Sequence, residues 1–217
     1  MLTFLVVLIV AVSIQLGTIA AVGAATGVTL RVLSIGYGRA LFQSGVFRLG
    51  LIPTGGYVSF RDSREETVPV EDLKTALDGR STLEQLFIIL SGCVVLLGTA
   101  YIAAGERAIQ AFLTLPAQAL AGALSPLGEA QTLLTDCSAF IATASTAALF
   151  GVVGAKVAAL NLLPFPSMNG GAALAVVGRK LSAARWWPPI ATRALLFVYL
   201  AFLASWCIAF VAHIGKA

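Results

Sequence analysis

The sequence predicts an all-α polytopic membrane bundle of about four transmembrane helices, with a small β-sheet at the membrane surface. Apolar residues make up 59% of the 217 residues and charged residues only 11%, whereas a soluble domain typically carries about 25% charged residues. Four segments are also apolar over the roughly 20 residues that are needed to cross a bilayer. We therefore expect residues 1–217 to form a single membrane domain.

The expected spans run over residues 2–25, 83–104, 140–163 and 194–214. No Lys or Arg precedes the first segment, and a signal peptide needs a positively charged start, so we expect a retained span. The shorter apolar stretch 108–124 contains Pro116 and Gln118, which favours an interfacial or re-entrant helix.

Positively charged residues are distributed unevenly over the expected loops, and such residues stay on the cytoplasmic side of a membrane. The first loop contains Arg31, Arg39, Arg48, Arg61, Arg64, Lys74 and Arg80, the second only Arg107, and the third Arg179, Lys180, Arg185 and Arg193. This distribution predicts that the N-terminus lies outside and that the first and third loops lie inside. Trp186 and Trp187 fit an aromatic belt at the cytoplasmic interface.

The first loop has two parts of different character. Residues 28–60 are rich in Gly, β-branched and aromatic residues, and 28–32 alternate as a half-buried strand does. Residues 53–56 form a turn signal, so a small twisted sheet is expected there. Residues 61–82 are polar with mixed charge and predict a solvated cytoplasmic loop, with a short helix around 70–77.

Three cysteines, Cys93, Cys137 and Cys207, lie far apart and are odd in number. They form neither a disulfide framework nor a Cys-x-x-Cys metal motif, and they are expected to be small buried hydrophobic residues. The loop topology explains the net charge of +4, so no nucleic-acid partner is inferred. No cofactor is expected.

Three stretches in register resemble a bacterial site-2 protease, an intramembrane zinc metalloprotease. The first, 27–58, ends in Pro53-Thr54-Gly55-Gly56-Tyr57-Val58, similar to the family's turn after its first catalytic span. The second is Ser91-Gly92-Cys93 at the start of a span. The third comprises 125–128 and 161–171, where Asn161-Leu162-Leu163-Pro164 looks like the end of a family span. The resemblance covers nearly the whole chain.

The resemblance implies a zinc ion held by two histidines of an H-E-x-x-H helix and by an aspartate, with the glutamate as general base. At the matching positions this chain has Ile14, Gln15, Thr18 and Asn169, and Leu96 replaces an asparagine thought to hold the substrate. Isoleucine has no lone pair, and a glutamine amide cannot act as a base. We therefore expect neither catalytic residues nor a metal site. Gln15 and Asn169 are expected to hydrogen-bond each other.

Two other features are candidate interaction sites. Lys156 lies inside the third expected span, where an ionisable residue suggests either an ion pair with a partner span or a side chain that reaches the interface. Gly55, Gly56 and Tyr57 keep the turn beside the edge strand that is thought to pair with substrate in the family. The alternative is a sheet retained only for fold stability.

The leading hypothesis is a pseudoprotease, not an enzyme, that acts as a scaffold or accessory subunit and binds other integral membrane proteins in the lipid bilayer. The alternative is an intramembrane metalloendopeptidase with a non-standard site. A transport or channel component is the third possibility, although the polar lining of the spans is thin. A bacterial inner (plasma) membrane fits the resemblance.

Overall fold

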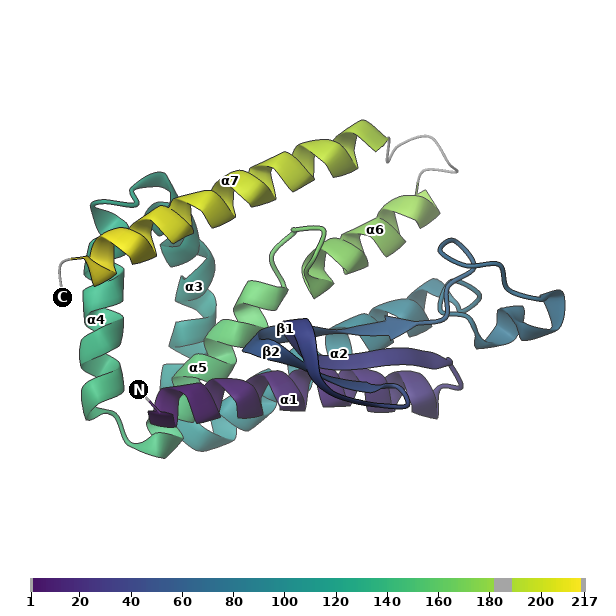
Figure 1. Ribbon diagram of the computed structural model, residues 1–217, viewed down its shortest axis with the longest axis horizontal. Coiled ribbons are helices and arrows are strands. Elements are labelled where there is room, and N and C mark those ends of the chain that lie inside the picture. The colour runs from purple at the N-terminus through teal and green to yellow at the C-terminus, as the bar shows by residue number, and fades with distance from the viewer. Residues whose placement is uncertain (1, 182–188, 216–217) are drawn as a thin grey trace.

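The protein is mostly helical, with one β-hairpin packed on the N-terminal helices (Figure 1). The computed structural model describes residues 2–181 and 189–215. Its elements in chain order are α1 (Leu2–Ala25), β1 (Leu30–Ser44), β2 (Phe47–Phe60), the 3₁₀ helix η1 (Val70–Thr75), α2 (Thr82–Ala104), α3 (Glu106–Leu124), α4 (Glu129–Thr143), α5 (Thr146–Asn161), α6 (Asn169–Leu181) and α7 (Pro189–Ile214). The predicted helical class with a small sheet is therefore confirmed.

Three helices in the described part of the chain are long and apolar enough to cross a membrane: Leu2–Ala25, Thr82–Ala104 and Arg193–Ile214. The expected span 140–163 is divided instead, because α4 ends at Thr143 and the Ser145 hydroxyl caps a new helix by accepting from the Ala148 N–H. The resulting α5 is apolar but has only 16 residues. That the chain crosses the membrane about four times stays a prediction.

Small residues bring α1, α2 and α5 close together. A Cβ added to Gly92 of α2 would lie 2.4 Å from the Gln15 carbonyl oxygen of α1, and one added to Gly151 of α5 would lie 2.2 Å from Ala104. Ala11, Cys93, Leu96 and Ala158 form a buried cluster where these three helices meet. Such close approach is how membrane helices gain packing energy without a hydrophobic driving force.

The hairpin folds back over itself instead of running straight. Residues 33–35 of β1 pair with 56–58 of β2 and also with 47–49, so the middle of β1 has a neighbour on both sides. Gly36 has a φ of 87°, and a Cβ there would lie 2.8 Å from the Gly50 carbonyl oxygen. Only glycine fits such a bend, because it tolerates positive φ and has no side chain to clash.

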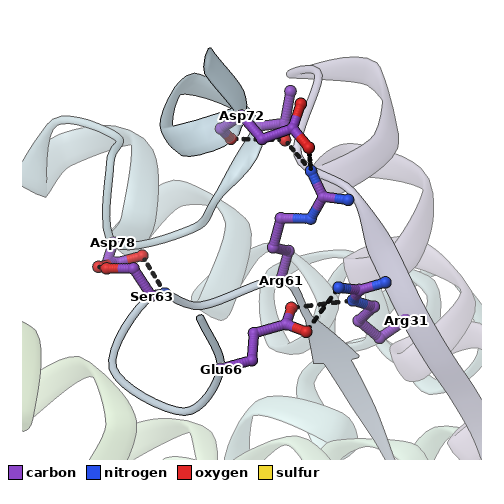
Figure 2. Close-up of polar contacts among 7 residues, drawn as sticks. Arg31, Arg61, Ser63, Glu66, Asp72 and Asp78 are labelled. Atoms are coloured by element: carbon purple, nitrogen blue, oxygen red, sulfur yellow. Dashed lines mark hydrogen bonds and ion pairs between the residues drawn. The ribbon is translucent and has the colours of Figure 1, made fainter. Parts of the chain in front are cut away.

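Segment 61–82 is more ordered than the mixed charge predicted (Figure 2). Arg31 of β1 binds Glu66 at 2.5 Å, and Arg61 binds Asp72 at 2.8 Å. Ser63 donates its backbone N–H to Asp78 at 3.0 Å, and the short helix expected around 70–77 is η1. These contacts fix the base of the hairpin next to the start of α2, where Ser81 and Glu84 form a capping box.

Helices α3 and α4 run crosswise to α1, α2 and α7 at the end of the bundle where the N-terminus lies (Figure 1). Helix α3 covers the stretch 108–124 that was expected to be an interfacial or re-entrant helix, and its place relative to the membrane stays a prediction. Helix α7 is tied to it by Trp206, which donates to the Ala119 carbonyl at 3.1 Å. The tryptophans of the expected aromatic belt, Trp186 and Trp187, lie outside the described residues.

Candidate functional site

Gln15 lies near the middle of α1, is only 2% exposed, and connects three helices through its side-chain amide. Its oxygen accepts from Asn161 of α5 at 3.2 Å, and its nitrogen donates to the Cys93 sulfur of α2 at 3.7 Å. A buried amide in an apolar helix must be satisfied internally. Gln15 therefore fixes how α1 sits against α2 and α5.

Asn169 begins α6 and donates to the Ile89 carbonyl at 3.0 Å and to the Cys93 sulfur at 3.6 Å. The hydrogen bond that we expected between Gln15 and Asn169 is therefore replaced by a shared contact with Cys93. We refer to Gln15, Cys93, Asn161 and Asn169 as the amide–thiol cluster. It joins α1, α2, α5 and α6 at one point.

The remaining positions at which the family would hold its catalytic machinery are apolar or satisfied locally. The Thr18 hydroxyl donates to the Ile14 carbonyl of its own helix at 2.7 Å, a common local arrangement of threonine. Leu96 is fully buried, and Ile14 packs against the apolar cluster that contains it. Leu96 and the apolar side chain of Ile14 offer no polar atom to a ligand at this site.

The side chains at the cluster do not fit a zinc ion. Protein zinc sites use thiolate, imidazole and carboxylate ligands, with three of them in catalytic sites. Across residues 2–181 and 189–215, no three His, Cys, Asp or Glu side chains come together to hold a metal. The cluster contributes three carboxamides and a single sulfur, Cys93, and the amide N–H groups of Gln15 and Asn169 point toward that sulfur.

Strand β2 places its glycine pair, Gly55 and Gly56, at the side of the hairpin that faces the helix carrying Gln15, and Gly56 lies directly against that helix. A Cβ on Gly56 would lie 2.6 Å from Leu16 and 2.1 Å from the Ser34 carbonyl oxygen, so only glycine permits this approach. The Tyr37 hydroxyl donates to the Gly56 carbonyl at 3.1 Å. Arg48 donates to the Tyr57 hydroxyl at 3.2 Å. The structure thus places Gly56 against Leu16 of α1, the neighbour of Gln15 in the sequence.

A β-bulge lies where the hairpin meets α1. Tyr37 pairs with Ile52 and Ile35 pairs with Gly56, so three residues of β2, 53–55, face Gly36 alone. Bulges interrupt the ladder and often lie next to functional sites. The sequence predicted a turn at 53–56, whereas the structure extends β2 through this segment.

Lys156 does not join the cluster. Its ammonium group donates to the Gln118 oxygen of α3 at 2.7 Å, on the side of α5 that faces α3. Asn161 was expected only as part of the motif that ends a span, although an amide inside an apolar run is a signal for a functional or packing contact. Cys93 was expected to be a small buried hydrophobic residue; it is buried, and it is also the shared acceptor of the cluster.

Segment 162–168 is irregular and separates α5 from α6 beside the cluster. Two glycines let α6 begin against it: a Cβ on Gly170 would lie 2.1 Å from the Leu162 carbonyl oxygen. A Cβ on Gly171 would lie 2.0 Å from the Phe165 carbonyl oxygen. Non-helical backbone at membrane depth is tolerated only where protein or a water-filled cavity covers it.

Comparison with known proteins gives consistent results. The family model described as "Peptidase family M50" matches residues 4–205. A "Regulator of sigma E protease" of Haemophilus influenzae is 35% identical over 71 residues, covering 30% of this chain and 16% of that protein. A "Putative zinc metalloprotease" of Pasteurella multocida is 38% identical over 71 residues, again covering 30% of this chain and 16% of the relative.

These findings correct one expectation from the sequence. We expected a protein that is not an enzyme, but the family description and the names of both relatives point to a metalloprotease. The expectation rested on substitutions at five positions, and replaced side chains describe the donor set without measuring activity. The amide–thiol cluster nonetheless offers zinc a poor set of ligands.

Proposed function

The chain belongs to peptidase family M50, the site-2 protease family, and from that premise we propose that it binds an extended segment of another integral membrane protein beside the β-bulge at 53–55. The single observation that carries the proposal is the position of this bulge: it ends at Gly56, which touches Leu16 next to Gln15. A bound segment would therefore lie next to the part of α1 that carries Leu16. The matched relatives are far longer than the part they share with this chain, so their activity enters here as a proposal too.

The backbone of the hairpin supports strand addition. An interrupted ladder leaves N–H and C=O groups that an extended chain can pair with, and main-chain hydrogen bonds supply the affinity in this mode of recognition. Pro53 has no N–H to donate, so pairing there would rest on its carbonyl and on the neighbouring residues.

The side chains around the bulge indicate what kind of segment fits. Tyr37, Leu51, Ile52 and Tyr57 are 47%, 57%, 50% and 39% exposed. Alternate side chains of an extended chain point to the same face. An apolar segment, such as the unwound end of a transmembrane helix, would bury those that share its face, since the neighbours Leu51 and Ile52 point to opposite faces.

Photo-crosslinking in native membranes tests the proposal. A photoreactive phenylalanine analogue at Tyr57 should give adducts with integral membrane proteins, and the same analogue at Tyr101 of α2 is the matched control, because that tyrosine is 52% exposed and lies on another element. Equal adducts at both positions would count against the hairpin as the binding edge. Gly56→Val would push β2 away from Leu16, and adducts at Tyr57 that persist in this variant would also count against it.

The family membership also defines the second candidate function, intramembrane peptide hydrolysis. Purified full-length chain should be incubated with a crosslinked partner, with and without added zinc, and the products sequenced. Cleavage together with about one equivalent of retained zinc would establish peptidase activity with ligands other than those at the matched positions. Absence of cleavage over the range of zinc and pH in which a control family member cuts would limit the chain to binding.

We also propose a bacterial inner membrane as the location, with the N-terminus outside. The bacterial source of both relatives supports the first part. The concentration of Arg and Lys in the first and third loops supports the second.

A further inference from the structure

Lys156 lies at membrane depth. Asn161 hydrogen-bonds Gln15, which follows Leu2 by 13 residues, about 20 Å along α1. Lys156 precedes Asn161 by five residues, about 7.5 Å along α5. With α1 crossing the bilayer, the Lys156 backbone is therefore about 12 Å or more from the level of Leu2. That position lies inside a hydrocarbon core of about 30 Å.

The ammonium group has a neutral partner at this depth. It donates to the Gln118 amide oxygen at 2.7 Å. The three ion pairs among the described residues all involve residues 31–72 and none involves Lys156. A charge in apolar surroundings is costly unless a counter-charge or several hydrogen bonds stabilise it.

The helices around Lys156 offer no counter-charge. Cys137 of α4 is near enough to interact with it electrostatically, but a thiol is ordinarily neutral. Asp136 precedes Cys137 and so points about 100° away around the helix. The acidic residue of α3, Glu106, lies 12 residues before Gln118, about 18 Å along the axis. Apolar small residues, among them Ala155 and Ala111, cover the inner side.

We propose that Lys156 is the docking point for an acidic side chain carried by a transmembrane segment of a partner protein. Lys156 is only partly buried, so a segment that packs beside α3 and α5 can reach its ammonium group. A carboxylate on a membrane helix matches the depth, whereas a lipid phosphate lies outside the hydrocarbon core. This site lies between α3 and α5, away from the hairpin, and goes beyond the proposed function.

Association of a model peptide tests the site. Full-length chain in phosphatidylcholine vesicles is mixed with a Leu/Ala peptide of roughly 20 residues that carries one Asp at the depth of Lys156, and energy transfer between labels reports binding. The comparison peptide has Asn instead. The Asp peptide should bind about tenfold more tightly than the Asn peptide, the size expected for a strong polar contact between membrane helices.

Variants separate the possible outcomes. Lys156→Gln should remove the preference for Asp, and Lys156→Arg should keep it. Lys180→Gln, at an exposed position near the end of α6, is the matched loss of charge and should change nothing. Tyr57→Ala should also keep the preference, so a failure of the hairpin proposal would not be mistaken for a failure of this one. Equal binding of both peptides to the unmodified chain would overturn the inference, whether or not Lys156→Gln folds.

A change of lipid composition distinguishes a protein carboxylate from a lipid phosphate as the partner of Lys156. The measurement is repeated with phosphatidylglycerol vesicles that contain a spin-labelled anionic lipid. A preference for Asp that survives there supports a protein carboxylate. Loss of that preference, together with Lys156-dependent enrichment of the anionic lipid, would identify the occupant as a lipid phosphate and refute the docking proposal.

Discussion

At the scale of single residues, Cys93 organises the candidate site by accepting from two amides of different helices. Sequence reasoning identified Gln15 and Asn169 as partners from their positions but placed them in direct contact. The actual geometry depends on how far each helix is rotated about its axis, which an apolar pattern does not determine. The contribution of Asn161 was missed for the same reason.

Replacing Cys93 should destabilise the protein through those two amides. Cys93→Ala leaves the Gln15 and Asn169 N–H groups without their sulfur acceptor, at a cost of about 1–3 kcal/mol. Cys93→Ser should cost less, because a hydroxyl still accepts. Thermal unfolding in detergent measures both, and Cys207→Ala, at an exposed position, should change stability by less than about 0.5 kcal/mol. A Cys93→Ala variant as stable as Cys207→Ala would contradict the role of the sulfur.

Two glycines of α2 form a matched pair for testing helix packing. Gly92→Ala places a methyl group 2.4 Å from the Gln15 carbonyl oxygen, whereas Gly98 has open space around it. Gly92→Ala should cost about 1–3 kcal/mol through overpacking, and Gly98→Ala should gain about 0.5–1 kcal/mol from helix propensity. Comparing the unfolding midpoints checks the sign of each change, and equal effects would show that α1 does not approach α2 at Gly92.

At the scale of elements, the β-region 28–60 and the apolar helices could be predicted because each depends on local composition and periodicity. The bulge at 53–55 and the division of 140–163 could not. Ser145 caps a helix inside a run that reads as continuously apolar, and hydropathy averages over such a residue. Segment 61–82 was expected to be a solvated loop because its residues are polar with mixed charge. The ion pairs of Arg31 with Glu66 and of Arg61 with Asp72 join residues that are distant in the sequence, so they leave no local pattern.

Acid should loosen segment 61–82. Asp62 is 8% exposed, and although its burial opposes ionisation, the hydrogen bonds and charge of Arg64 outweigh that and hold its pKa below the usual 3.8. A lowered pKa in the folded state stabilises the fold above pH 3.8, and this contribution is lost as the pH falls through the folded value.

The matching measurement compares the unmodified chain with Asp62→Asn. At pH 7 the variant should be less stable by about 1 kcal/mol or less, because solvent screens the pair, and the gap should narrow as the pH falls below 3.8 through the lowered pKa of Asp62. A gap that stays constant as the pH is lowered well below 3.8 would show that the Asp62 charge does not contribute. Lys74→Gln serves as a control for loss of an exposed charge.

At the scale of the whole molecule, the helices fall into two groups. Helices α1, α2 and α7 contain the candidate spans, and α3 and α4 lie crosswise to them at one end of the bundle (Figure 1). No sequence pattern gives the angle at which one helix crosses another, since side-chain ridges and loop lengths decide it together. Family membership of the chain was predictable because the motifs occur in the correct order and spacing.

Orientation is testable on the intact chain. Single-cysteine variants in a Cys93→Ser, Cys137→Ser, Cys207→Ser background are labelled in sealed cells with a membrane-impermeant maleimide. A cysteine replacing Ser63 should be protected and one replacing Gly128 should react, because the first loop is expected inside and the second outside. The opposite labelling pattern would reverse the proposed topology.

The contact between Gln15 and Asn161 has a consequence for biosynthesis, because the two residues are 146 positions apart. At about 5–20 residues per second, roughly 7–30 seconds pass between the synthesis of the glutamine and that of its partner. The hairpin completes its ladder within residues 30–60, so the nascent chain folds its sheet early while α1 still carries an unsatisfied amide. During that interval the Gln15 oxygen lacks the Asn161 N–H from which it accepts in the folded protein, so the contact of α1 with α5 can form only after α5 has been synthesised.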